Sequence, residues 1–379
     1  MLYHWIIAGG LIIFALNILL NFWALKRPRK DSKLPKEPPL VSILIPTRDE
    51  EENIEACLKS LQNQDYHNFE ILVLDDSRSD DTFNIVQRIA AADERISLFQ
   101  SEPLPEGWVG KPFGCYQLAQ KAKGSWLLFV DADTIHEPHM LRSVLAIALK
   151  SKPGMLSGFP RQLTNSWPQK IAIPVIYFVI MSWFPLWWLQ RSKKPKPSLA
   201  VGQFLLFPKE VYWRFGGHEA VKSRILEDVW LGVETIRHGR RHIALDLSPV
   251  VSCNMFRNLG DMWEGFVRWL YSVAAVSRLA LVLLIAAGYV FFLAPFYWLW
   301  KELFVVSAPA GWETFLIFSQ VALIIVMRGL VDTRFRSSLV STVLHPISFS
   351  FLVLISLYGL LLRVIGVGVR WKNRLYSEA

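Results

Sequence analysis

Two aspartates, Asp131 and Asp133, directly follow an apolar run at 126–130 that predicts a buried strand. Because side chains alternate along an extended chain, we expect both carboxylates to lie on the same side. Open α/β sheets bind ligands at the carboxyl ends of their strands, and Mg²⁺ is usually held by one or two carboxylates plus substrate phosphates. The pair therefore predicts a metal–nucleotide site. The alternative is a polar turn in which Asp133 caps the following helix.

Polar side chains also end two earlier apolar runs, at 41–46 and 70–75. The first run ends in Pro46 and continues into Thr47 and Glu50, and Asp76 follows the second run. A hydroxyl and acids at strand ends can meet a base or a ribose, as the acidic residue of dinucleotide folds does. For Thr47 and Glu50 the alternative is a capping box at the start of the next helix.

Two further features lie next to expected helices. Gly107 and Gly110 precede Lys111, just before an expected helix at 112–122. Glycines allow the backbone to approach a ligand closely, and Lys111 can meet a phosphate as a point charge. Glu227 and Asp228 begin an expected helix at 226–238, where acids are favourable to the helix dipole. The functional interpretation makes Asp228 a general base that deprotonates an acceptor hydroxyl.

Arg268 and Trp269 lie on an amphipathic helix expected at 260–277, next to an apolar run. One interpretation is an interfacial anchor, in which the arginine meets lipid headgroups and the tryptophan meets the acyl boundary. The other is catalytic, with Arg268 offsetting the charge of a leaving diphosphate.

The elements that must position these side chains alternate between strands and helices. Strands are predicted at 41–46, 70–75, 95–99, 126–130, 199–207, 241–247 and 251–257, with helices at 51–62, 81–92, 112–122, 208–215, 226–238 and 260–277. This alternation predicts an α/β fold, a mostly parallel sheet covered by helices on both faces. The length suits one nucleotide-binding domain of roughly 200 residues.

The composition indicates a chain partly embedded in a membrane. Of its 379 residues 52% are hydrophobic and 19% are charged, against about 25% charged in average soluble proteins. The net charge is +9, but the basic residues gather beside apolar runs. That placement favours lipid headgroups of a bilayer over nucleic acid. Three scattered cysteines without CxxC spacing predict reduced, buried thiols.

An apolar run at 5–25 has about the roughly 20 residues needed to span a bilayer. It lacks a preceding basic region and a following cleavage site, so a retained anchor is expected. The basic cluster at 26–36 then places the next domain in the cytoplasm. Three more apolar runs follow at 279–300, 312–327 and 339–362, the middle one short for a span. The run 167–190 contains three prolines and ends in tryptophans and basic residues, including Lys193 and Lys196. It is predicted to lie in the interface.

The predicted spans leave one conflict of topology. Arg328, Arg334 and Arg336 fall in a loop that the spans place inside, as expected, but the basic tail around Lys372 then lands outside. Either the last hydrophobic hairpin is re-entrant, with Pro346 as a break, or one span is wrongly assigned.

Taken together, the Asp-x-Asp at 131–133, the Glu-Asp at 227–228 and the Arg-Trp at 268–269 resemble membrane-bound family 2 glycosyltransferases with a GT-A catalytic domain. They occur in that family's order and approximate spacing, and the resemblance covers about residues 41–269. The block at 107–111 and the final apolar runs look most like lipid-directed members, which glycosylate carotenoids, hopanoids or ceramide.

The resemblance implies a role for each motif. The nucleotide would be held by Pro46, Thr47, Glu50 and Asp76, with Lys111 near its phosphates. Asp131 would contact the nucleotide, and Asp133 would hold Mg²⁺ or Mn²⁺. Asp228 would be the catalytic base, and Arg268 with Trp269 would close the site.

The predicted organisation follows from the spans and the resemblance. In chain order it is a transmembrane anchor (1–25), a basic linker (26–39), a cytoplasmic GT-A catalytic domain (40–277) with interfacial helices at 168–190 and 260–277, about three C-terminal transmembrane helices (278–365) and a basic tail (366–379).

The predicted function is an inverting hexosyl transfer from a nucleotide-sugar (UDP- or GDP-sugar) to a hydroxyl of a membrane lipid. The acceptor would be carotenoid-, hopanoid- or sphingolipid-like, and the enzyme would be integral to the cell membrane. The family resembled here has Gln or Arg at the start of the Arg-Trp motif, a residue associated with acceptor or glycan-chain contacts, and this chain has Gly265 there. This departure disfavours the first alternative, a processive or short-chain polysaccharide synthase. The second alternative is a non-catalytic nucleotide-sugar-binding membrane subunit.

Overall fold

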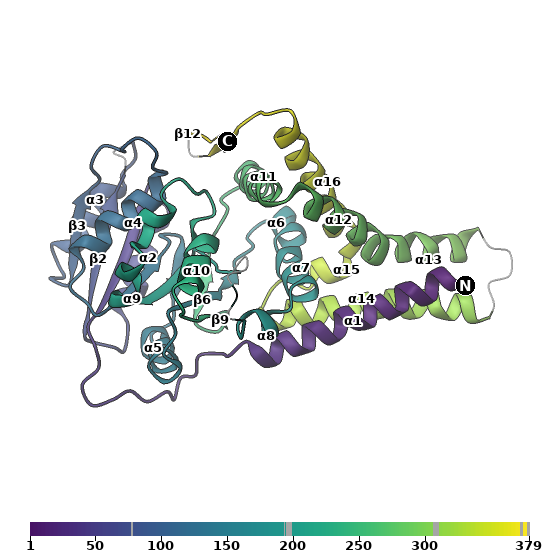
Figure 1. Ribbon diagram of the computed structural model, residues 1–379, viewed down its shortest axis with the longest axis horizontal. Helices are drawn as coiled ribbons and strands as arrows, with labels where there is room; N and C mark the ends of the chain where they lie inside the picture. The colour runs from purple at the N-terminus through teal and green to yellow at the C-terminus, as the bar shows by residue number, and fades with distance from the viewer. Residues whose placement is uncertain (77–78, 193, 195–198, 306–310, 372–373, 377–379) are drawn as a thin grey trace. The chain divides into compact units, whose positions relative to one another are not determined.

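The computed structural model describes residues 1–379 except 77–78, 193, 195–198, 306–310, 372–373 and 377–379. Lys193, Lys196 and Lys372 of the basic segments therefore lie outside the described residues. The chain forms two compact units (Figure 1). The sheet unit comprises Ala24–Arg161 and Leu186–Asn254, and the helical unit comprises Met1–Trp23, Gln162–Pro185 and Met255–Ala379.

The sheet unit is built on seven strands in the order β3-β2-β1-β4-β8-β6-β9. In chain order they are β1 (Val41–Thr47), β2 (Phe69–Asp75), β3 (Ile96–Gln100), β4 (Trp126–Val130), β6 (Met155–Phe159), β8 (Phe204–Pro208) and β9 (His242–Asp246). Strand β8 runs antiparallel to both its neighbours, and the other pairs are parallel. The predicted α/β fold with a mostly parallel sheet is confirmed.

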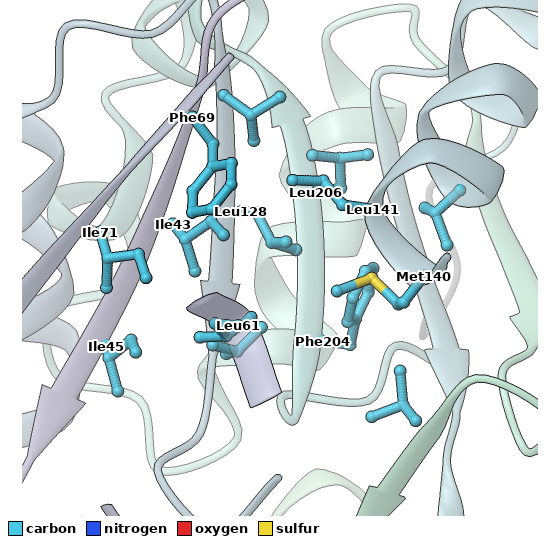
Figure 2. Close-up of a cluster of buried hydrophobic side chains, with 14 of the residues drawn as sticks. Ile43, Ile45, Leu61, Phe69, Ile71, Leu128, Met140, Leu141, Phe204 and Leu206 are labelled. Atoms are coloured by element: carbon cyan, nitrogen blue, oxygen red, sulfur yellow. The ribbon is translucent and has the colours of Figure 1, made fainter. Parts of the chain in front are cut away.

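Helices cover both faces of this sheet. They are α2 (Ile54–Gln62), α3 (Thr82–Ala90), α4 (Gly110–Lys121), α5 (Met140–Ser151), α9 (Lys209–Arg214), the 3₁₀ helix η1 (Gly217–Val221) and α10 (Glu227–Arg237). The short helix α8 (Leu186–Leu189) belongs to the same unit. Because side chains alternate along a strand, Ile43 and Leu128 join a core with α2, α3 and α5, shown in Figure 2. Leu44 and Phe129 join a second core with α4, α9 and α10.

For 134–162 the sequence patterns predict only a helix that follows Asp133, without bounds, whereas the structure has several elements there. Besides α5 and β6, this segment holds β5 (Thr134–His136) and β7 (Arg161–Gln162). A small sheet has the order β5-β10-β7, with β10 at Val251–Cys253. Short strands give little periodicity, and β6 contains Ser157 and Gly158, which carry no strong strand preference.

The helical unit contains the apolar segments. Its elements are α1 (Leu2–Ala24), α6 (Trp167–Ala172), α7 (Val175–Trp183), α11 (Leu259–Val276), α12 (Arg278–Gly288), the π-helix η2 (Tyr289–Leu293), α13 (Ala294–Phe304), α14 (Trp312–Arg334), α15 (Val340–Val343), α16 (His345–Val364), β11 (Val369–Trp371) and β12 (Arg374–Tyr376). Four described helices are long and apolar enough to cross a membrane: Leu2–Ala24, Arg278–Phe304, Trp312–Arg334 and His345–Val364. The predicted anchor and three later spans match these four helices.

The segment predicted to lie in the interface is broken into short helices, α6, α7 and α8. Pro174 separates α6 from α7, and Pro185 precedes α8. Asn17 and Asn21 of α1 donate side-chain hydrogen bonds to the carbonyl of Phe184, just past the end of α7, at 3.2 and 2.8 Å. These donors satisfy a carbonyl that the helix itself leaves unpaired. Contacts group α6, α7 and α11 with the helical unit, whereas the predicted boundaries placed them with the catalytic domain.

Helix α14 corrects the prediction for residues 312–336. It runs from Trp312 to Arg334, so this span is not short, and Arg328 lies inside it instead of in a loop. Arg328 is fully buried and pairs with Asp332 one turn later, Nε to Oδ2 at 3.0 Å. Ser341 and Thr342 donate hydrogen bonds to the same carboxylate oxygen, at 2.6 and 2.8 Å. Charges within an apolar run resemble the end of a span. The i,i+4 spacing of Arg328 and Asp332 was the available local signal for their pairing, whereas the hydroxyls of Ser341 and Thr342 come from a separate helix.

Helix α16 also differs from the prediction. Pro346 lies at the first turn of α16, after the separate short helix α15. Proline fits a first helical turn because its missing N–H has no partner there in any case. The apolar run is thus broken at Leu344, between α15 and α16, and Pro346 begins the second of these helices.

Replacing Asp332 by asparagine should lower the melting temperature of the solubilised full-length protein. The change leaves the buried guanidinium of Arg328 without a counter-charge, which costs about 3–5 kcal/mol. The double variant Arg328→Gln/Asp332→Asn should recover part of the loss. Asp261→Asn is the matched control, because the Arg257–Asp261 pair has the same spacing but is far more exposed than the Arg328–Asp332 pair. Its effect should stay below about 1 kcal/mol. An Asp332→Asn protein as stable as the wild type would contradict the expectation.

Candidate active site

The register of the sheet brings the predicted site segments to one edge. Thr47 pairs with Asp75 at the carboxyl ends of β1 and β2. Val130, the last residue of β4, pairs with Phe204, the first residue of the antiparallel β8. The residues after β4 and those before β8 are therefore neighbours. The strand order also reverses between β1 and β4, and open α/β sheets bind ligands at such a point.

Asp131 and Asp133 lie in a tight turn, which corrects the predicted extended backbone. The backbone carbonyl of Asp131 accepts hydrogen bonds from the N–H and the hydroxyl of Thr134, at 3.2 and 2.6 Å. Asp133 does not cap the next helix, because α5 starts only at Met140. The helix-cap alternative is therefore not realised.

The carboxyl of Asp133 lies in an electrostatically unfavourable place. Its Oδ1 atom is buried and has no hydrogen-bond partner among the described residues. Burial, together with the negative charges of Asp131 and Glu50, raises the pKa of Asp133 to about 7, although the Cys253 thiol and Lys111 act in the opposite direction. A buried acceptor without a partner is costly. This carboxyl therefore needs either a proton or a cation.

Lys111 lies in the first turn of α4 and joins two acidic segments. Its Nζ is 2.6 Å from Oδ1 of Asp131 and 3.4 Å from Oε1 of Glu227. Burial alone would lower the pKa of Lys111, but the charges of Asp131 and Glu227 outweigh it and hold that pKa well above its usual value. Lys111 is therefore a fixed cation between the end of β4 and the start of α10. The sequence did not predict the ion pair of Lys111 with Glu227. It indicated only that Glu227, as an acid at a helix start, is favourable to the helix dipole.

Asp228 is held by backbone donors at the start of α10. Its Oδ2 accepts from the N–H of Gly202 at 2.7 Å, and its Oδ1 accepts from the N–H of Val229 at 2.8 Å. Burial and the neighbouring charge of Glu227 raise the pKa of Asp228 to about 7, although Lys111 and both backbone donors oppose the shift. A carboxyl with a pKa near neutrality suits proton abstraction at physiological pH.

The residues predicted to hold a nucleotide occupy the adjoining strand ends. Thr47 donates its hydroxyl to the carbonyl of Leu74 at 3.2 Å, so it does not cap α2, and the capping-box alternative is not realised. Glu50 accepts from the amide of Asn53 at 3.0 Å. Pro46 precedes Thr47 in β1 and packs close to Gly114 of α4. A methyl group added to Gly114 would lie 3.4 Å from Cβ of Pro46.

Asp76 has a partner that sequence reasoning missed. Arg48 Nη1 lies 3.0 Å from Oδ2 of Asp76, and the N–H of Asp76 donates to the carbonyl of Thr47 at 2.9 Å. Arg48 lies between Thr47 and Glu50, in the loop already assigned to the nucleotide site. A basic residue in that loop was the available signal for a partner of Asp76. The pairing fixes the carboxylate of Asp76 at the strand edge.

Arg268 and Trp269 lie on α11, in the helical unit, and both are half-buried. The structure does not test their predicted role beside the acids of the sheet unit. One local feature explains the departure at Gly265. A methyl group added there would lie 2.4 Å from the ring of Phe256, so the larger residue of the family pattern requires that ring to move.

Asp131 and Asp133 could hold a divalent cation together with a diphosphate. The described residues contain no cluster of three or more His, Cys, Asp or Glu side chains that could hold a metal. Two carboxylates nevertheless match Mg²⁺ or Mn²⁺, which take their remaining ligands from substrate phosphates and water. The unpartnered Oδ1 of Asp133 is the observation that fits this occupant.

Asp133→Ala should weaken Mn²⁺-dependent binding of UDP or GDP by at least about tenfold, because one of two candidate metal ligands is lost. Isothermal titration calorimetry of the full-length protein, with and without Mn²⁺, measures the effect. Asp31→Ala is the control, since Asp31 is an exposed acid of the linker. Equal Mn²⁺ dependence in the wild type and Asp133→Ala would exclude this carboxylate as a ligand.

Comparisons with known proteins identify related sequences and a related structure. The chain is 25% identical over 248 residues to the 4,4'-diaponeurosporenoate glycosyltransferase of Staphylococcus haemolyticus, which covers 65% of this chain and 64% of the relative. It is 38% identical over 96 residues to the GalNAc(5)-diNAcBac-PP-undecaprenol beta-1,3-glucosyltransferase of Campylobacter jejuni, covering 25% of this chain and 30% of the relative. The matched segments thus span less than two thirds of either relative.

A solved structure shares the fold. It is a mannosyltransferase of Pyrobaculum calidifontis in complex with GDP-Man and Mn²⁺, with a TM-score of 0.52 and 17% identity, covering 93% of this chain and 98% of that one. This likeness confirms the expected GT-A fold. The sequence also matches the profile of Glycosyl transferase family 21 over residues 6–378. The chain therefore belongs to glycosyl transferase family 21.

Proposed function

We propose that this glycosyltransferase moves a sugar from a nucleotide-sugar to a hydroxyl of a membrane lipid, with inversion at the sugar carbon. The observation that carries the proposal is the placement of Asp228 beside Gly202 and Lys111, at the same sheet edge as Asp131. One site thus holds a carboxyl with a pKa near neutrality and a fixed cation for phosphate. Transfer of a sugar from a nucleotide-sugar to a hydroxyl requires a base that removes the proton of the hydroxyl and a cation that stabilises the leaving diphosphate.

Proton transfer is assigned to Asp228. As the sugar carbon gains oxocarbenium character, the carboxylate takes the proton of the acceptor hydroxyl, and that oxygen attacks the face opposite the diphosphate. Lys111 offsets negative charge that develops on the departing diphosphate. A divalent cation at Asp131 and Asp133 would add Lewis-acid stabilisation of the same leaving group. The presence of Mn²⁺ in the complex of the Pyrobaculum calidifontis mannosyltransferase supports this cofactor.

The donor is a UDP- or GDP-sugar in this proposal. Pro46, Thr47, Glu50 and Asp76 would hold its base and ribose at the ends of β1 and β2, and Asp131 would contact the nucleotide. Arg268 and Trp269 would close over the diphosphate from α11. The GDP-Man of the neighbouring structure supports a nucleotide-sugar in general and does not distinguish the two bases.

The acceptor is a lipid in this proposal. Both relatives carry names that specify lipid or lipid-linked acceptors, and four described helices are suited to a bilayer. The basic linker at 26–36 supports a cytoplasmic site, because basic segments beside spans remain on the cytoplasmic side. The ring of Phe256 over Gly265 supports single transfer over polymer synthesis, since it occupies the space of a chain-contacting side chain.

Asp228→Asn should abolish transfer and leave donor binding within about twofold, because the amide cannot accept a proton. Membranes holding each variant are incubated with labelled UDP- and GDP-sugars and then extracted with organic solvent. Label in the organic phase supports lipid transfer, and label in an insoluble polymer supports the synthase instead. Bound nucleotide without any transfer by the wild type would favour a binding subunit. Wild-type turnover by Asp228→Asn would exclude Asp228 as the base.

The rate should fall as the pH drops below about 7, because Asp228 acts only when ionised and its pKa lies there. Lys111→Met removes a cation that lowers this pKa, so the acidic limb of the kcat/KM profile should move up by roughly half to one pH unit. Lys121→Met is the control, since Lys121 lies exposed at the far end of the same helix. An acidic limb that does not move in Lys111→Met would contradict the expected coupling.

A further inference from the structure

Gly202 occupies the narrow space between the proposed base and the fixed lysine. It lies in the turn that leads into β8, where the N–H of Phe204 donates to the carbonyl of Val201 at 3.2 Å. Its own N–H donates to Oδ2 of Asp228 at 2.7 Å. A Cβ at this position would lie 3.2 Å from Oδ2 of Asp228 and 3.4 Å from Nζ of Lys111.

The backbone at Gly202 is fixed from the following residues. The side-chain amide of Gln203 donates to Sγ of Cys253 at 2.9 Å, and both residues are buried. Phe204 then pairs with Val130 in the central sheet. The backbone of Gly202 therefore cannot move away from Asp228 unless the pairing of Phe204 with Val130 is lost. A methyl group added to Gly202 must instead be accommodated by movement of Asp228 or Lys111.

We propose that Gly202 is a positioning residue of the transfer reaction, which holds Asp228 with its N–H and, by having no side chain, lets Lys111 and Asp228 face each other directly. This inference rests on the proposed function, because it concerns the residue assigned there as the base. No local sequence pattern singles out Gly202, since its surroundings follow from the antiparallel direction of β8.

Two consequences follow for the reaction. The N–H of Gly202 aims one oxygen of the carboxylate, and the N–H of Val229 holds the other, so the direction of proton removal is set by backbone atoms. The charged groups that face Asp228 are Glu227, which disfavours its ionised form, and Lys111, which favours it. A methyl group between Lys111 and Asp228 displaces one or both and weakens the favourable interaction.

Gly202→Ala should lower kcat by roughly tenfold or more, because displacement of a reacting group by a fraction of an ångström has effects of this order. The KM for the donor should change by less than about twofold, since the nucleotide is assigned to other strand ends. The acidic limb of the kcat profile should move to higher pH. Steady-state kinetics of the full-length protein with a labelled nucleotide-sugar across pH 5–9 measures all three quantities.

Gly9→Ala is the matched control, because the same added methyl group meets nothing within 4 Å there. Nucleotide binding by calorimetry serves as the check of folding. An active wild type with unchanged kcat and pH profile in Gly202→Ala would overturn the positioning role and leave the proposed function intact. Loss of nucleotide binding together with activity would show a merely structural role and also overturn it. A wild type without transfer from any donor would instead overturn the proposed function.

Discussion

The arrangement of the site depends on one partly buried cation, Lys111. Four acids, Asp131, Asp133, Glu227 and Asp228, approach one another where β4 ends and α10 begins, and their mutual repulsion opposes this approach. Lys111 contacts two of them directly and offsets the charge of the others. A lysine among carboxylates keeps its proton, so the cluster has a permanent internal positive charge. The charge balance remains incomplete, which leaves the pKa values of Asp133 and Asp228 high.

The direction of a single strand determines which acids can share that cation. Because β8 is antiparallel to β4, its first residue, and not its last, meets the end of β4. The turn before β8 therefore supplies a backbone donor at the edge where parallel strands supply their carboxyl ends. A parallel strand in the same place would bring the segment around Pro208 to this edge and would remove Gly202 from the site.

Much of the fold could be predicted from the sequence, because buried strands and spans carry strong local signals. The strand at 126–130 and the apolar runs match β4 and the candidate spans. The predictions that failed depended on distant contacts. Arg328 looked like a loop residue because its partner Asp332, one turn away, is held in turn by the hydroxyls of α15, a separate helix. Gly202 and the pairing of Arg48 with Asp76 required the register of the sheet.

The asparagines of α1 give the first helix a role beyond attachment. Asn17 and Asn21 reach the carbonyls of Met181 and Phe184 at the end of α7, at distances of 2.8 to 3.2 Å. In a low-dielectric environment with little water, each carbonyl without such a donor would cost several kcal/mol. An unrelated hydrophobic helix grafted in place of α1 would keep the chain at the membrane but leave these carbonyls unsatisfied. Helix α1 is thus matched to α7 by its asparagines, and a replacement of equal length and hydrophobicity would lack these donors.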